Sequence, residues 1–103
     1  MKPGFFTMPL HPPGSDMTEL LKSDLHQIVK LDELGYEEAW IGEHFTAEWE
    51  PIPSPELFIA QALGVTKNIR LGTGVTCMPN HDPFVLAHRI AQLDHMAEGR
   101  LNW

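Results

Sequence analysis

Two neighbouring residues, Glu43 and His44, are the strongest candidates for chemistry in this sequence. They directly follow a short, mostly apolar run, Ala39 to Gly42. A histidine at the end of a buried strand can act as a general base or hydrogen-bond an oxygen-bearing intermediate, because histidine titrates near neutral pH. A histidine that only caps the strand at the surface is the alternative, and the spacing alone leaves both interpretations open.

A second candidate is the glycine-rich segment Leu71 to Val75, with the sequence Leu-Gly-Thr-Gly-Val. It lacks the Gly-x-Gly-x-x-Gly pattern that opens a helix in dinucleotide-binding proteins. Glycines inside a strand weaken it, unless another group approaches closely or the backbone is unusual. A planar ring lying against the strand end and a β-bulge are both compatible with this pattern.

The histidines and the single cysteine raise the question of a metal or redox site. The six histidines are scattered, and the His-Glu-x-x-His spacing of metalloproteases is absent, so we expect no metal site. One cysteine excludes an internal disulfide. We interpret Cys77 as a small buried thiol, because no neighbouring sequence feature would activate it.

The composition describes one small, acidic globular domain. The chain has 103 residues, 43% of them hydrophobic, and a net charge of −7. Non-specific nucleic-acid binding needs a basic face, which this charge opposes. No apolar run reaches the ~20 residues that cross a bilayer, and the first residues do not resemble a signal peptide. We therefore expect a cytoplasmic chain without nucleic-acid or membrane partners.

Short strands alternate with amphipathic helices along the whole chain. N-caps are expected at Asp16, Ser54 and Asp82, and Gly35 and Gly99 are expected to end the first and third helices. This β-α-β-α-β-α-β order predicts a parallel sheet covered by helices, with ligands at the carboxyl ends of its strands. Strands are expected at residues 4–10, 39–42, 69–75 and from 100 onward, and helices at 17–34, 55–66 and 83–97.

Such a sheet is either an open four-stranded sheet or the first part of a (β/α)8 barrel, which needs about 250 residues. Its first and last strands would present unpaired edges, and its inner face would be apolar. We therefore expect the chain to self-associate as a homo-oligomer. The residues expected on the inner face are Phe5, Phe6, Trp40, Ile41, Leu71 and Val75.

Several segments in this order resemble the bacterial luciferase-like, flavin-dependent monooxygenases. The most specific is Met78 to Pro83, with the sequence Met-Pro-Asn-His-Asp-Pro, and Leu34 to Thr46 and Thr66 to Val75 also resemble the family. The resemblance implies α/β architecture, with residues 1–103 forming the N-terminal β-α-β-α-β-α-β portion of a (β/α)8 TIM barrel with parallel strands. This partial domain is expected to stop at the start of the fourth strand.

The resemblance also implies a cofactor and site residues. Reduced FMN, or a deazaflavin in some branches, is expected at the carboxyl mouth of the barrel, where a small organic substrate such as an aldehyde, alkane or terpene is oxygenated. His44 matches the family's catalytic histidine, and Gly74-Val75 matches a non-proline cis peptide bond beside the flavin ring. Asn102 falls where the fourth strand approaches the flavin, and Glu43 lies at the mouth.

A flavin reductase that supplies reduced flavin is the partner that the resemblance implies. Phe45 stands where luciferases proper often have a second histidine, which favours the broader monooxygenase branch over light emission. The family's phosphate-binding loops lie outside these 103 residues, so we expect the isolated chain to be inactive. Two alternatives stay open: a non-catalytic fragment or accessory subunit that self-associates through sheet edges, and a small stand-alone flavin-binding module.

Overall fold

The computed structural model describes residues 1–103 and contains one parallel sheet with the strand order β1-β2-β3-β4. Each strand is joined to the next by a helix, which confirms the predicted alternation. The strands are β1 (Gly4–Thr7), β2 (Glu38–Ile41), β3 (Arg70–Thr73) and β4 (Leu101–Asn102). The helices are α1 (Met17–Glu33), α2 (Pro55–Leu63) and α3 (Pro83–Ala97), with a 3-10 turn η1 (Met78–Asn80).

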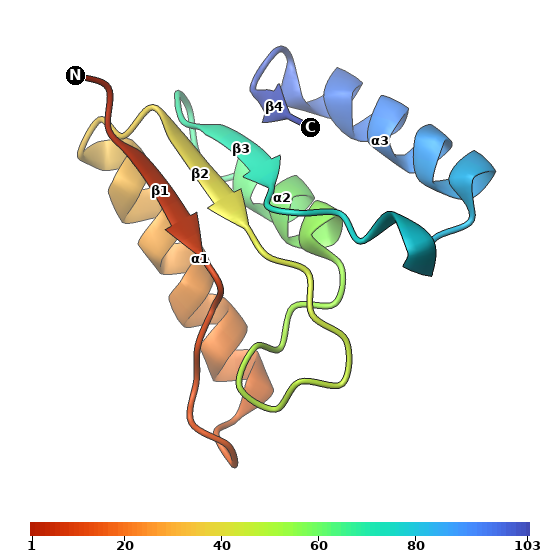
Figure 1. Cartoon of the computed structure of the whole chain (residues 1–103). Coiled ribbons are helices and arrows are strands. Elements are labelled where there is room, and N and C mark those ends of the chain that lie inside the picture. The colour runs from red at the N-terminus through yellow and green to blue at the C-terminus, as the bar shows by residue number, and fades with distance from the viewer.

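All three helices cover the same face of the sheet, and the opposite face is uncovered (Figure 1). Ile41 and Leu71 are fully buried on the helix side, and Phe5 packs against the same core. The expectation that these three residues face the inside of a barrel is therefore wrong. Phe6 and Trp40 alternate with them along β1 and β2 and lie on the uncovered face, as expected.

The core fills the space between the sheet and the helices. Its side chains are mainly branched aliphatic groups, which pack well between a pleated sheet and helices. None of the helices is both long enough and apolar enough to cross a lipid bilayer. The large side chains of this core are Ile28, Leu31, Ile41, Ile52, Phe58, Ile59, Leu63, Ile69, Leu71 and Leu93.

The helix starts follow the predicted capping chemistry at two of three positions. Asp16 Oδ1 accepts a hydrogen bond from the Glu19 amide at 3.0 Å, and Asp82 Oδ1 accepts one from Val85 at the same distance. Ser54 makes no such bond, so its prediction as a side-chain cap is wrong. The prolines that begin α2 and α3 need no N–H partner in the first turn.

Four elements are shorter than the sequence predicts, among them α1, which ends at Glu33 rather than at residue 34, and β2 begins and ends one residue earlier. The first strand ends at Thr7 rather than at residue 10, and Pro9 has no N–H to continue the ladder. The third covers Arg70–Thr73 rather than 69–75. Helix α2 ends at Leu63, because Gly64 and the residues after it turn toward β3.

A single carboxylate, Asp32 near the end of α1, anchors the turn that leads into β3. It accepts backbone hydrogen bonds from Lys67 at 2.7 Å, Asn68 at 2.9 Å and Ile69 at 2.8 Å. Desolvation by burial acts to raise the pKa of Asp32, but these three bonds and the nearby Arg100 outweigh it and hold that pKa below its ordinary value. The charged form of Asp32 therefore stabilises the fold.

We expect the variant Asp32→Asn to be less stable than the wild type by about 1–3 kcal/mol at neutral pH, because an amide accepts fewer and weaker bonds. A lowered pKa in the folded state gives stabilisation that is present above the unfolded pKa and lost as the pH falls through the folded one. The difference between the two proteins should therefore shrink below about pH 4. Urea unfolding at a series of pH values measures it, with exposed Glu33→Gln as the control, and a difference independent of pH would contradict the assignment.

Candidate active site at the strand ends

The carboxyl ends of β2 and β3 lie side by side and carry most of the predicted site residues (Figure 1). The Gly42 amide donates to Thr7 O at 3.0 Å, which ties the end of β2 to the end of β1. The Gly74 amide donates to Ile41 O at 2.8 Å, which ties the exit of β3 to β2. The segments that begin at Gly42 and Gly74 therefore leave the sheet next to each other.

His44 is held against the end of β2 from several directions. Its amide donates to Ile52 O at 2.9 Å, and its ring lies against Gly42, where an added Cβ would stand 3.0 Å from the ring Cε1. Its Nε2 lies 3.0 Å from Glu50 Oε2. Its Nδ1 is buried and has no hydrogen-bond partner. The imidazole is thus fixed in place with one nitrogen unpartnered.

The side chain of Glu43 is fully covered and binds the loop that follows β3. Its two oxygens lie 2.9 and 3.0 Å from His81 Nε2, and Oε2 also accepts the Cys77 amide at 3.2 Å. Both carboxylate oxygens are therefore engaged within the chain. Glu43 holds the loop from Thr76 to His81 against the end of β2, and sequence reasoning missed this role of His81.

The peptide bond between Gly74 and Val75 is cis, as the family resemblance implies. The close approach that the two glycines predicted is made by rings of the chain itself. A Cβ on Gly72 would stand 2.7 Å from the Trp40 ring, and one on Gly74 would stand 2.8 Å from the Phe6 ring. Val75 follows with its side chain largely exposed at the mouth.

We expect Gly72→Ala to destabilise the chain by about 1–3 kcal/mol or more, because the added methyl would meet Trp40 and also the backbone oxygen of Asn102 at 2.8 Å. A backbone oxygen within a sheet cannot move aside as a flexible side chain can. Thermal unfolding of this variant and of a control, Gly64→Ala, measures the effect. In the control, the nearest atom to the added Cβ is 3.4 Å away. Equal stability of the two variants would contradict the close packing.

Asn102 lies on the uncovered face but not at the mouth, since it pairs with Gly72 in the middle of the sheet. Its Oδ1 accepts from Arg70 Nε at 2.9 Å and from an Arg70 terminal nitrogen at 2.6 Å. Its Nδ2 donates to Glu38 Oε2 at 3.3 Å. The structure therefore separates Asn102 from His44 and Glu43 and places it in a polar cluster with Arg70 and Glu38.

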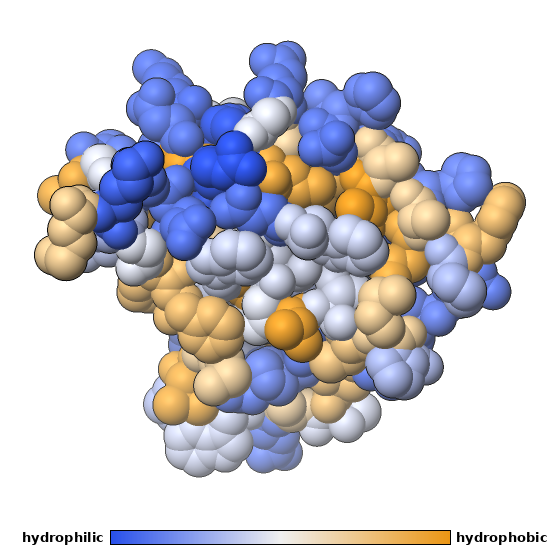
Figure 2. Space-filling view, turned by 45° about the horizontal axis from the view of Figure 1, so that its top comes forward, coloured by the Kyte–Doolittle hydropathy of each residue, from blue (hydrophilic) through white to orange (hydrophobic).

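The uncovered side of the molecule mixes polar and apolar surface. Hydrophilic side chains gather along the upper rim of the view in Figure 2, and side chains of intermediate and high hydropathy occupy its middle. Phe6 and Val75 are 56% and 65% exposed, so the mouth offers apolar surface beside the Glu43–His81 pair. Cys77 is half-buried rather than fully buried. No group of three or more His, Cys, Asp or Glu side chains is arranged to hold a metal ion.

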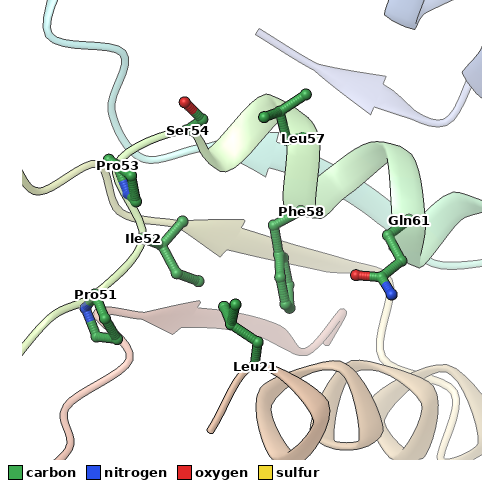
Figure 3. A pocket seen from close by; sticks show the side chains of 8 residues that line it. All are labelled: Leu21, Pro51, Ile52, Pro53, Ser54, Leu57, Phe58 and Gln61. Carbon is green, nitrogen blue, oxygen red and sulfur yellow. The ribbon is translucent and has the colours of Figure 1, made fainter. Parts of the chain in front are cut away.

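A separate apolar cavity of about 250 Å³ lies between α1, α2 and the loop that precedes α2 (Figure 3). Leu21 reaches it from α1, Phe58 from α2 and Ile52 from the loop. It borders the helices that cover the sheet and contains none of the predicted site residues. A hollow of about 350 Å³ borders the candidate site and is lined by His44, by Met17 and by residues of the loop from Thr46 to Pro53.

Comparison with known proteins identifies relatives that match nearly the whole chain. This chain is 54% identical over 97 residues to 4-hydroxyprotoasukamycin monooxygenase of Streptomyces nodosus subsp. asukaensis, and the match covers 94% of this chain and 26% of that protein. It is 42% identical over 98 residues to limonene 1,2-monooxygenase of Rhodococcus erythropolis, covering 95% of this chain and 25% of that protein. The chain thus spans about a quarter of the length of these relatives.

Solved structures share the fold. The oxygenating constituent of 3,6-diketocamphane monooxygenase from Pseudomonas putida, in complex with FMN, matches with a TM-score of 0.94 and 34% identity over 98% of this chain and 28% of its own. The coenzyme F420-dependent tetrahydromethanopterin reductase of Methanopyrus kandleri matches with a TM-score of 0.69 and 27% identity over 97% and 25%. The family model described as luciferase-like monooxygenase matches residues 1–103. The chain therefore belongs to the luciferase-like monooxygenase family and corresponds to the N-terminal portion of its TIM barrel.

Proposed function

We propose that this chain forms the first part of a flavin-dependent monooxygenase that uses reduced FMN and O2 to oxygenate a small organic substrate such as an aldehyde, alkane or terpene. One observation carries the proposal: His44 and the Gly74-Val75 segment leave adjacent strands at the carboxyl edge of the sheet. Barrels of this class bind their ligands at that edge. The relatives named above are monooxygenases, and one of them is in complex with FMN.

Two local features fit a flavin ring at this edge. Gly74 and Val75 present backbone and an exposed apolar side chain, which suit the face of a large planar ring. The unpartnered Nδ1 of His44 can form a hydrogen bond with a group bound at the same edge. Reduced flavin, when bound, supplies the electrons that activate O2. Nδ1 of His44 would accept a proton or a hydrogen bond from a group bound beside it.

Glu43 and Asn102 complete the proposed site and act through their neighbours. Glu43 fixes the loop from Thr76 to His81, and so the exit of the segment that would border the flavin. Asn102 orders Arg70 and Glu38 beneath the mouth, on the inner face of the barrel. Neither side chain has to turn toward the flavin for these roles.

The substrate and protein partners follow from the same surface and from the reaction. The exposed Phe6 and Val75 favour a small apolar substrate over a charged one. A reaction that consumes reduced flavin requires a flavin reductase to regenerate it. As the second candidate function, an accessory fragment would assemble through the edges of β1 and β4, whose outer backbone groups are unpaired within this four-stranded sheet.

The experiment uses a completed barrel, in which these 103 residues replace the matching first part of the 3,6-diketocamphane relative. We expect the completed barrel to bind reduced FMN and to oxygenate a terpene ketone or aldehyde, and the 103 residues alone to do neither. Titration with reduced FMN and with a reduced deazaflavin, followed by fluorescence, decides which flavin is preferred. A folded completed barrel that binds neither flavin would contradict the proposal and favour the accessory role.

A further inference from the structure

We propose that Glu50 is the positioning residue of His44. It holds a proton on Nε2 of the imidazole, and so leaves Nδ1 as the nitrogen that accepts a hydrogen bond at the mouth. The catalytic consequence of this arrangement rests on the function proposed above, whereas the arrangement itself can be tested in the 103-residue chain.

The contact between the two side chains is close and partly shielded from water. Nε2 of His44 lies 3.0 Å from Oε2 of Glu50, and the two side chains are only 28% and 21% exposed. A charge pair that is partly withdrawn from water is screened less than one at the open surface. The contact is an ion-pair contact rather than an aligned hydrogen bond, so it is the negative charge of Glu50 that favours a proton on the nearer nitrogen, Nε2.

The backbone holds Glu50 in this position from both sides. The preceding residue, Trp49, accepts a hydrogen bond through its carbonyl from the His11 amide at 2.7 Å. Two residues later, the Ile52 carbonyl accepts from the amide of His44 itself at 2.9 Å. The loop that carries Glu50 is therefore fastened both to the segment after β1 and to the residue that Glu50 contacts.

The other side of the ring leaves His44 little room to turn. Gly42 lies close to the ring of His44. A Cβ added to Gly42 would stand 3.0 Å from Cε1 and 3.4 Å from Nδ1 of that ring, and it would stand 3.3 Å from a side-chain carbon of Met8. Nδ1 is buried and has no partner in the chain. A buried acceptor without a donor is unfavourable, so this nitrogen gains from any donor that a bound group brings to it.

A neutral imidazole carries one proton, and the second nitrogen is then an acceptor. With the proton on Nε2, facing Glu50, the acceptor is Nδ1. Glu50 thereby determines which nitrogen of His44 can take a proton or a hydrogen bond from a substrate or from reduced flavin. It touches neither of these groups itself and acts only through His44.

The test reads the position of the proton directly. Nitrogen-15 NMR of the 103-residue chain at about pH 8.5, where histidine is ordinarily neutral, distinguishes protonated from unprotonated ring nitrogens. We expect the ratio of Nε2–H to Nδ1–H forms of His44 to fall about tenfold in Glu50→Gln, because the amide lacks the charge that stabilises the proton. Glu50→Asp, which keeps the charge, should recover part of the ratio. The exposed neighbour Glu48→Gln, in the same loop, should leave it unchanged.

Two results would overturn the proposal: a proton on Nδ1 in the wild type, or an unchanged ratio in a folded Glu50→Gln variant. In the completed barrel, we expect Glu50→Gln to lower kcat about tenfold with little change in the KM for substrate, and Glu50→Asp to restore part of the rate. If the NMR ratio responds as expected but His44→Ala leaves oxygenation intact, Glu50 positions His44 and the proposed catalytic role of His44 fails.

Discussion

Replacing His44 by alanine in the completed barrel is expected to lower the rate of oxygenation about 10²–10⁴-fold, the range that one general acid–base or hydrogen-bonding side chain commonly contributes. Flavin binding should change little, because the backbone of Gly74 and Val75, and not the imidazole of His44, would flank the ring. Single-turnover kinetics with reduced FMN and O2 measures the rate, and fluorescence titration measures the affinity for the flavin.

Another histidine of the chain supplies the control for this variant. His26 is exposed on α1, away from the strand ends, so His26→Ala should leave both rate and flavin affinity unchanged. His44→Asn keeps a polar group at the position and should still lose most of the rate, since an amide cannot exchange a proton near neutral pH. A His44→Ala variant that turns over normally but no longer binds flavin would make His44 a binding residue instead.

Replacing Glu43 by alanine is expected to cost about 3–5 kcal/mol of folding stability, the usual effect of removing one partner from a buried pair. The side chains of Glu43 and His81 are 0% and 7% exposed, so His81 Nε2 and the Cys77 amide would both lose their acceptor away from water. The loop from Thr76 to His81 would also lose its attachment to β2. Urea unfolding of the 103-residue chain measures the loss.

The exposed loop residue Glu48 provides the matched control, because Glu48→Ala removes the same charge and is expected to change stability by less than about 0.5 kcal/mol. A double-mutant cycle with His81→Ala separates the pair from its surroundings. The losses in the free energy of unfolding caused by the two substitutions should not be additive. If Glu43→Ala lowers the free energy of unfolding no more than Glu48→Ala does, the Glu43–His81 pair contributes nothing to the attachment of the loop from Thr76 to His81.

Short sequence signals, such as helix-capping residues, predicted much of the fold. Helix α3 has the predicted bounds, because Asp82 and the proline after it fix its start and Gly99 follows its end. The face of each strand was harder to predict. Phe5 and Phe6 are both apolar, so β1 shows no alternation that could tell the helix side from the uncovered side, and only the packing of Phe5 against the core decides it.

The candidate site was predictable where it depended on strand ends and not where it depended on distant partners. The positions of Glu43 and His44 follow from the end of one short strand. The partner of Glu43, His81, is 38 residues away, and no spacing rule connects them. Its place in the Met78 to Pro83 motif was the one available signal. The glycines correctly indicated a close approach, but the approaching rings belong to Trp40 and Phe6.

The position of the flavin relative to His44 and the Gly74-Val75 segment decides whether the carboxyl ends of β2 and β3 form the cofactor site. A crystal structure of the completed barrel with FMN would measure it. We expect side-chain or backbone atoms of His44, Gly74 and Val75 within about 4 Å of the isoalloxazine ring, with Glu43 still bound to His81. A flavin bound elsewhere, such as in the cavity between α1 and α2, or a ring separated from His44 by other side chains, would contradict it.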